Sequence, residues 1–185
     1  MMGKFLASFI VVCGVLAGGG MYYLQVYAFY DAVVPNGSSD VVLTKKLNSI
    51  AEPIAYTNFQ AIDSKSSPIR YRACFQSSKS PVELGSVYKT IDDAVPLNAP
   101  SWFKCFKAKE LGSKIEAGEA VSFLAIENIV YGIDRVVTIL PNGLGYSWNR
   151  INNCGKRAFD GKPLLPGCPL PPESLSLIHI SEPTR

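Results

Sequence analysis

FLASFIVVCGVLAGGGMYYLQVYAFY, residues 5–30, is the stretch that decides how this chain is organised. It carries no charged side chain over 26 residues, and Ser8 and Gln25 are its only strongly polar residues. A helix rises about 1.5 Å per residue, so a helix of this length exceeds the ~30 Å hydrocarbon core of a bilayer. The sequence therefore predicts one membrane-spanning helix.

The charges that flank this stretch predict its orientation. Lys4 and the α-amino group precede it, and Asp31 is the first charge after it. Positive charge beside a spanning segment tends to stay cytoplasmic, so we expect the N-terminus inside and the domain outside. The predicted location is the inner (cytoplasmic) membrane, with the domain facing the periplasm. Aromatic residues suited to the headgroup level gather at the C-terminal end of the stretch: Tyr22, Tyr23, Tyr27, Phe29 and Tyr30.

Two other interpretations of the stretch are open. Signal peptidase would have a passable site after Ala17, although the apolar run continues well past it. Cys13 would be a lipid-attachment cysteine in the other interpretation, although Val12 before it is not a small residue. We prefer to interpret Cys13 as a small apolar residue in a membrane helix.

The last eleven residues, LSLIHISEPTR, resemble the translation of a transposon-type sequencing-library adapter. Such a segment carries no information on fold or function and must be set aside before further reasoning. It contains His179, the only histidine of the chain. The predicted organisation is an anchor at 1–30, a linker at 31–40, an extracytoplasmic domain at 41–174 and an adapter-derived tail at 175–185.

Length and charge limit the class of protein. The predicted domain of roughly 140 residues is long enough to bury a core of its own. The net charge is +3, and the basic residues are scattered rather than grouped. We therefore expect no nucleic acid as a partner. The apolar stretch predicts contact with the membrane, and an envelope protein is a possible partner.

Four cysteines outside the apolar stretch predict disulfides. An even number fits an oxidising compartment, which the predicted topology supplies. We favour Cys74–Cys105 together with Cys154–Cys168, because neighbours in the sequence close short loops. Free buried thiols and a four-thiolate zinc site are the alternatives. A zinc site would usually show a C-x₂-C pair, which this sequence lacks.

The order of patterns predicts an α+β fold, with a small antiparallel sheet and one packed helix after the membrane helix. Glu110 and Lys114 form an i, i+4 pair in the predicted helix, at 107–117. Asn142-Gly143 predicts a hairpin in which both residues have positive φ. Residues 77–100 are expected to be mostly loop, and the chain after Cys154 an extended arm. The predicted strands are 41–43, 54–62, 69–75, 121–126, 133–140 and 145–151.

Few side chains suggest chemistry. Arg70 and Arg72 fall on one face of the predicted strand 69–75 and would suit a carboxylate or phosphate, whereas a solvated face is the simpler interpretation. Glu127, Asp134 and Asp160 are possible general acids or bases, but no spacing pairs them. The stretch YSWNRINNCG, 146–155, is a conceivable surface site or simply hairpin packing with turn-forming asparagines.

No motif identifies a reaction. The sequence contains no nucleotide-binding glycine motif, no P-loop and no C-x-x-C. Without His179 no histidine remains to activate a serine or cysteine nucleophile. We therefore assign no catalytic residue, no metal ligand and no cofactor.

Three segments together resemble an uncharacterised alphaproteobacterial family: SSPIRYRACF at 66–75, WFKCF at 102–106, and YGIDRVV with PNGLGYSWNRINNCG within 131–155. The resemblance implies a short single-pass membrane protein and no established activity. Some members of the family are labelled histidine kinases. The missing histidine and nucleotide motifs argue against that label here.

The sequence thus predicts a membrane-anchored periplasmic binding or scaffolding module that is not an enzyme. One alternative is a carboxylate-based enzyme that acts on an anionic substrate through Arg70 and Arg72. The other is a sensor, which would need a cytoplasmic output domain that the few residues before Phe5 do not provide.

Overall fold

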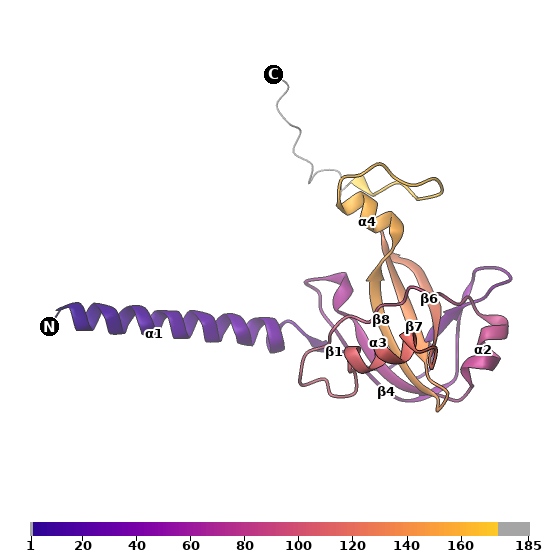
Figure 1. Cartoon of the computed structure of the whole chain (residues 1–185), viewed down its shortest axis with the longest axis horizontal. Helices are drawn as coiled ribbons and strands as arrows, with labels where there is room; N and C mark the ends of the chain where they lie inside the picture. The colour runs from indigo at the N-terminus through magenta and orange to yellow at the C-terminus, as the bar shows by residue number, and fades with distance from the viewer. Residues whose placement is uncertain (1, 174–185) are drawn as a thin grey trace, which may run out of the picture.

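A computed structural model describes residues 2–173 of the 185-residue chain. Its first element is a long helix that projects away from a compact domain (Figure 1). Helix α1 (Met2–Tyr23) has no buried residue and continues into a π-helical turn, η1 (Leu24–Ala28). Within the described residues, this is the one helix long and apolar enough to cross a membrane. The predicted tail, with His179, lies outside the described residues.

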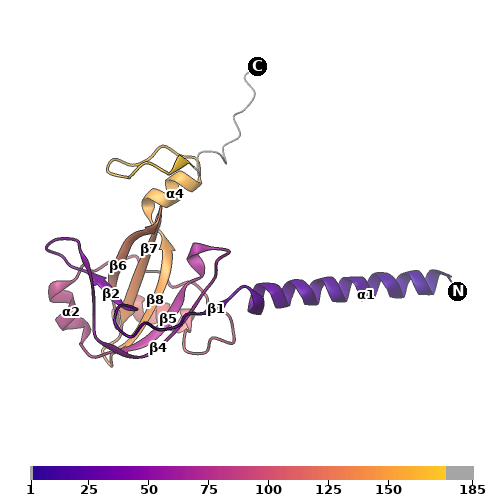
Figure 2. The same cartoon turned by 180° about the vertical axis from the view of Figure 1, so that it is seen from behind.

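The domain is built on one antiparallel sheet, and the predicted α+β class is confirmed. A two-stranded hairpin, β2 (Val42–Thr44) with β3 (Ala51–Pro53), lies on one face, where β2 runs beside β6 (Figure 2). The six strands of the main sheet, in spatial order, are β1 (Asp31–Ala32), β4 (Tyr56–Asp63), β5 (Arg72–Ser77), β8 (Leu144–Ile151), β7 (Ile133–Ile139) and β6 (Val121–Val130).

The domain contains more helices than the single one predicted. Helix α3 (Ala108–Glu116) is the expected one. Helices α2 (Pro81–Val87) and α4 (Asn153–Phe159) form where a loop and an extended arm were predicted. Each has only seven residues, too few to show a helical repeat of apolar positions. Their N-caps are visible in the sequence nevertheless.

Each of these short helices starts at a side-chain cap. Ser80 Oγ accepts from the backbone N–H of Glu83, and the Glu83 carboxylate accepts from the backbone N–H of Ser80, which makes a capping box. Asn152 Oδ1 accepts from the backbone N–H of Gly155 at the start of α4. The capping residues therefore mark the starts of these two helices, which are too short to show a helical repeat.

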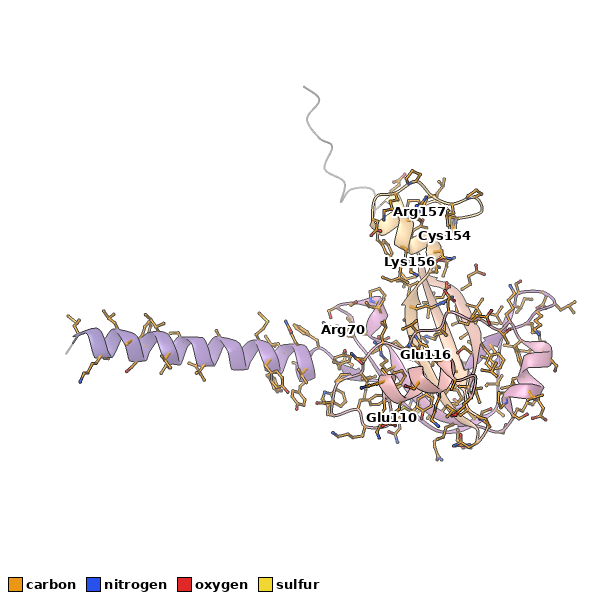
Figure 3. All side chains as sticks on the ribbon, viewed as in Figure 1. Arg70, Glu110, Glu116, Cys154, Lys156 and Arg157 are labelled. Atoms are coloured by element: carbon orange, nitrogen blue, oxygen red, sulfur yellow. A yellow bond between two sulfur atoms is a disulfide. The ribbon has the colours of Figure 1, made fainter. Side chains whose placement is uncertain are left out.

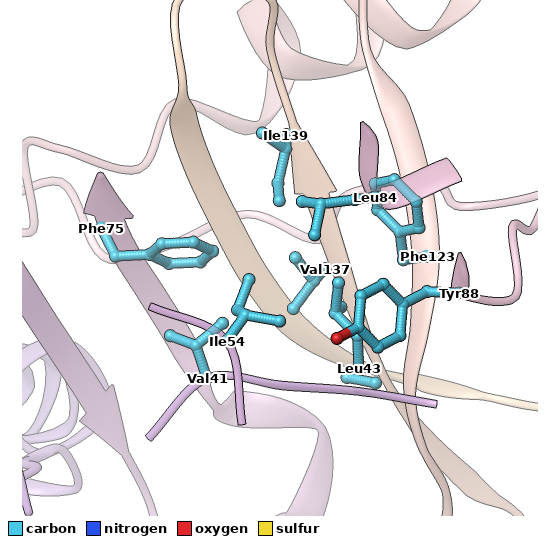
Figure 4. Close-up of a cluster of buried hydrophobic side chains, with 10 residues drawn as sticks. Val41, Leu43, Ile54, Phe75, Leu84, Tyr88, Phe123, Val137 and Ile139 are labelled. Carbon is cyan, nitrogen blue, oxygen red and sulfur yellow. The ribbon is translucent and has the colours of Figure 1, made fainter. Parts of the chain in front are cut away.

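The alternation of side chains along each strand divides the core into two layers. One layer lies between the sheet and β2, β3 and α2, and holds Phe75, Phe123, Val137 and Ile139 from the sheet (Figure 4). The opposite layer holds Trp148, which is 0% exposed, and packs under α3 and the loop that precedes it. The sheet is thus covered on both faces, so most residues of its central strands are buried, and these include polar ones such as Arg72 and Asn149.

The hairpin between β7 and β8 forms at the predicted Asn-Gly pair but with a different turn. Gly143 has φ +81°, whereas Asn142 is not in the positive-φ region, so the expectation for Asn142 is wrong. The backbone N–H of Gly143 donates to Leu140 O (2.9 Å), and that of Leu140 donates to Leu144 O (2.9 Å). A three-residue loop with glycine in the left-handed region replaces the two-residue turn.

The cysteines outside α1 form two pairs. Cys74 and Cys105 are joined with Cα atoms 6.2 Å apart, and Cys154 and Cys168 with Cα atoms 5.6 Å apart. Cys13 lies exposed on α1 without a partner. The segment 31–40, predicted as a linker, opens with β1, which pairs with β4 and so ties the end of the N-terminal helix directly to the sheet.

Candidate functional site

A polar cavity of about 240 Å³ lies where the turn between β6 and β7, the end of β8 and the arm after α4 meet. Carboxylates, amides and one guanidinium line it. The residues that line the cavity come from four separate segments of the chain: Asp93; Glu127, Asn128 and Asp134; Arg150, Asn152, Asn153 and Cys154; and Gly167 and Pro169 on the arm. This cavity gathers more groups capable of polar chemistry than the cavities beside α3, beside Phe29 and beside Val121.

The local backbone is shaped by an irregularity in β6. The register with β7 shifts between Ile126 and Val130, and Asn128 has φ +48°. The break predicted at residues 127–128 is therefore a bulge inside a strand that continues to Val130. Beyond it, Gly132 (φ +74°) packs so closely on Gly155 that neither has room for a Cβ atom. This contact seats the start of α4 on the turn.

Asp134 is the buried centre of the cavity wall, with 6% of its surface exposed. Its Oδ1 accepts from the backbone N–H of Asn128 (3.0 Å) and from Asn152 Nδ2 (2.8 Å). Asn128 Oδ1 in turn accepts from Asn152 Nδ2 (3.0 Å) and from the backbone N–H of Gly132 (3.1 Å). One oxygen of Asp134 is thus engaged in holding the bulge, the turn and α4 together.

Arg150 and Asp93 form the other wall. Arg150 Nη1 donates to the Asp93 carboxylate and also to the Asp93 backbone carbonyl (3.0 Å). The hydrogen bond from Arg150 lowers the pKa of Asp93 below its ordinary value. Arg150 Nε is buried and has no partner in the part of the chain that the structure describes. Glu127 is exposed at the rim.

The charges of the cavity favour a particular kind of ligand. Three carboxylates face one guanidinium, and the amide groups offer further donors and acceptors. Such a lining suits hydroxyl or ammonium groups of a ligand. For catalysis, Glu127 lies in solvent and Asp134 has one oxygen engaged in the fold, so the arrangement suits binding better than proton transfer.

The two arginines predicted to share a strand face lie apart, and that premise is wrong. Arg70 ends the 3-10 helix η2 (Pro68–Arg70), whereas Arg72 opens β5. Arg72 is buried and donates to four backbone carbonyls, those of Ile69, Tyr71, Leu97 and Asn98, at 2.7–3.0 Å. Burial lowers its pKa to about 10, so it remains charged at neutral pH.

Arg70 lies instead beside the end of the N-terminal helix (Figure 3), with its guanidinium carbon 5.9 Å from the ring centre of Phe29 and 5.5 Å from that of Tyr30. Anion binding by Arg70 stays a prediction. The third candidate carboxylate, Asp160, lies at the end of α4, is exposed and pairs with Lys162 (2.8 Å), outside the cavity. Of the predicted acids, the structure therefore brings together Glu127 and Asp134 only.

Four of the ten residues that line the cavity come from the 146–155 stretch that the sequence marked as a conceivable surface site: Arg150, Asn152, Asn153 and Cys154. Asp93 was missed, because it lies in a loop with no pattern of its own. Its position depends on Arg150, 57 residues away along the chain. No sequence motif spans so many residues, so none could have linked Asp93 to Arg150.

Comparison with known proteins gives a family without a function. Residues 41–169 match the family described as "Family of unknown function (DUF6446)". This is most of the chain, so the chain belongs to that family. No curated protein matches the chain, and no solved structure does.

Proposed function

We propose that this member of the DUF6446 family is a single-pass protein of the inner membrane that holds a binding domain in the periplasm. The observation that carries the proposal is α1, which is apolar on all sides and buries none of its residues against the domain. A helix that is apolar all round needs an apolar environment on every side, and lipid supplies it. The anchor is then 1–30, the connection 31–40 and the domain 41–174.

Two further observations support the side of the membrane on which the domain lies. The two disulfides fit an oxidising compartment such as the periplasm. Lys4 before the helix favours a cytoplasmic N-terminus. The resemblance to alphaproteobacterial proteins agrees with a cell that has a periplasm.

The polar cavity beside α4 is the proposed binding site, and an envelope protein or polymer with ammonium or hydroxyl groups is the proposed ligand. Its carboxylates and amides match such groups, and it opens at the rim carrying Glu127. The second candidate function is a carboxylate-based enzyme. The cavity favours it by uniting Glu127 and Asp134 with Arg150, but Arg70 and Arg72 take no part.

Reporter fusions test the topology. Alkaline phosphatase fused after Tyr30 should be active in cells, and green fluorescent protein fused at the same point should stay dark. The chain should remain in the membrane fraction at full length. A fluorescent green fluorescent protein fusion together with an inactive phosphatase fusion would overturn the proposal. Release of the domain after cleavage at Ala17 would overturn it as well.

Site-specific photo-crosslinking tests the binding site. A photoreactive amino acid at Glu127, on the cavity rim, should give a specific adduct in intact cells. The matched control is Glu116, exposed on α3 away from the cavity (Figure 3), which should give none. Equal adducts at both positions, or none at Glu127, would contradict binding at the cavity.

A further inference from the structure

The end of the anchor does not swing freely on the domain. Trp102, from the loop before α3, donates its Nε1–H to Val26 O in η1 at 2.7 Å. Its ring stacks on Tyr27 with centroids 6.3 Å apart and meets Tyr30 edge-on at 6.0 Å. We call this contact the anchor clamp. It holds one face of the domain at the point where the membrane helix ends.

The position of that face relative to the membrane surface follows from the side chains in the anchor clamp. Trp and Tyr rings prefer the headgroup region, where an apolar body and a polar tip are both satisfied. Tyr27, Tyr30 and Trp102 therefore mark the membrane surface. Segments that lie beside the clamp are within reach of lipid headgroups.

A hollow of about 380 Å³ lies at this level, between the end of the anchor and the loop after β4. Ala28 and Phe29 form its apolar part, which is continuous with the exposed surface of α1. The polar part consists of Asp31, Ser64, Lys65 and Ser66. One side thus suits an acyl chain and the other a headgroup.

The charged residues of the hollow have no partners of their own. Lys65 and Asp31 are both exposed, and neither forms an ion pair within residues 2–173, with each other or with another residue. A cation and a carboxylate that stand apart match a headgroup that carries both signs of charge. A phosphodiester would lie at Lys65 and a primary ammonium at Asp31. A purely anionic headgroup would place its charge beside Asp31 and gain less.

We infer that this hollow binds the headgroup of an aminophospholipid, of the phosphatidylethanolamine class, from the outer leaflet of the membrane that holds the anchor. The inference rests on the proposed function, because it requires α1 to be embedded in that membrane. The hydroxyl groups of Ser64 and Ser66 are hydrogen-bonded to each other (2.8 Å), which uses one of their two hydrogens and leaves one donor for a phosphate oxygen.

Lipid retention on the full-length chain tests the inference. The chain in mild detergent is incubated with equal amounts of phosphatidylethanolamine, phosphatidylcholine and phosphatidylglycerol, and bound lipid is counted by native mass spectrometry. We expect a preference for phosphatidylethanolamine of roughly threefold or more, the size that exposed charge pairs supply. Lys65→Ala and Asp31→Asn should each remove the preference.

Matched controls are Lys162→Ala and Asp160→Asn, an exposed lysine and aspartate on the arm that should leave the preference unchanged. Equal retention of the three lipids would overturn the inference. A preference for phosphatidylglycerol, or one that survives both variants in the hollow, would overturn it as well.

A second measurement separates this inference from the proposed function. In vesicles of phosphatidylcholine brominated near the glycerol backbone, tryptophan fluorescence should be quenched, and Trp102→Phe should abolish the quenching, because Trp148 is fully buried in the domain. If Trp102 is quenched but the chain retains the three lipids equally, only the headgroup site is overturned. No quenching of Trp102 would defeat the membrane placement on which both depend.

Discussion

Two segments of this domain, 91–107 and 153–170, are each tied down by one disulfide, but only the first belongs to the core. The inner loop, 91–107, buries Ala94, Phe103 and Phe106. It also receives hydrogen bonds at its carbonyls from Arg72 and Trp148. The disulfide Cys74–Cys105 is one of several attachments that act together.

The outer arm, 153–170, has much weaker support. Leu170 is 84% exposed, and Phe159 and Leu165 are exposed too. Its contacts with the domain include one hydrogen bond from the Tyr131 hydroxyl to Pro169 O (3.0 Å) and the packing of Gly155 on Gly132. One disulfide therefore reinforces a segment that is already packed, 91–107, whereas the other substitutes for packing in 153–170.

The largest effect should come from the side chain that holds the inner loop by its carbonyls. Arg72→Met removes a buried guanidinium that donates to four backbone carbonyls, and we expect a loss of roughly 4 kcal/mol in the free energy of unfolding. Urea unfolding of the full-length chain in detergent measures it. Arg157→Met on the arm, where one hydrogen bond to Pro163 O is lost, should cost less than about 1 kcal/mol. Equal losses would erase the difference between the segments.

The second-largest effect should be the difference in stability lost when each of the two disulfides is removed. Removing the inner bond with Cys74→Ala and Cys105→Ala should cost about 3 kcal/mol, because the denatured chain gains freedom that the packed loop does not. Removing the outer bond with Cys154→Ala and Cys168→Ala frees the arm in the native state as well. We therefore expect less than about 1 kcal/mol there, together with faster proteolysis of the arm. A larger loss for the outer pair would contradict our description of the arm.

The anchor clamp should give a smaller, local effect. Trp102→Phe keeps a ring but removes the donor to Val26 O, a hydrogen bond worth about 1 kcal/mol. Amide exchange over residues 27–32 should accelerate roughly fivefold, as measured by mass spectrometry of the full chain. Tyr131→Phe, which removes the hydroxyl that holds the arm, should leave these amides unchanged. Unaltered exchange in Trp102→Phe would mean that the clamp does not hold the anchor.

The smallest effect concerns the ion pair that joins the inner loop to the polar cavity. Arg150 lowers the pKa of Asp93 in the folded state, so the pair stabilises the fold above the ordinary aspartate pKa of about 4. This stabilisation disappears as the pH falls through the lowered pKa. We expect Asp93→Asn to cost less than about 1 kcal/mol at neutral pH, because Asp93 is largely exposed, and nothing in strong acid.

The control for this experiment is Asp92→Asn, since the Asp92 side chain is exposed beside Asp93 without an ion pair in the described chain. It should change stability little at any pH. A cost for Asp93→Asn that persists unchanged in strong acid would show that the ion pair is not its origin.

How much of the structure could be predicted depended on how far apart along the chain the interacting residues lie. The strands around Phe75, Val137 and Ile139 follow from period-two patterns, and α3 from a helical repeat, because each depends on neighbouring residues. Helices α2 and α4 were missed although Ser80 and Asn152 cap them, because a cap alone is a weak signal. Arg70 and Arg72 were separated by a 3-10 turn that begins at Pro68, which a strand pattern does not reveal.

The amino-acid sequence by itself determined the apolar N-terminal helix, the antiparallel α+β class and the hairpin at Asn142-Gly143, because these depend on the composition and spacing of adjacent residues. Only the tertiary structure decided that Asp93 and Arg150 meet, that Trp102 contacts the end of the N-terminal helix, and that Lys65 and Asp31 line one hollow. Those contacts join residues separated by tens of positions. Their geometry follows from how the sheet is covered, which no local pattern encodes.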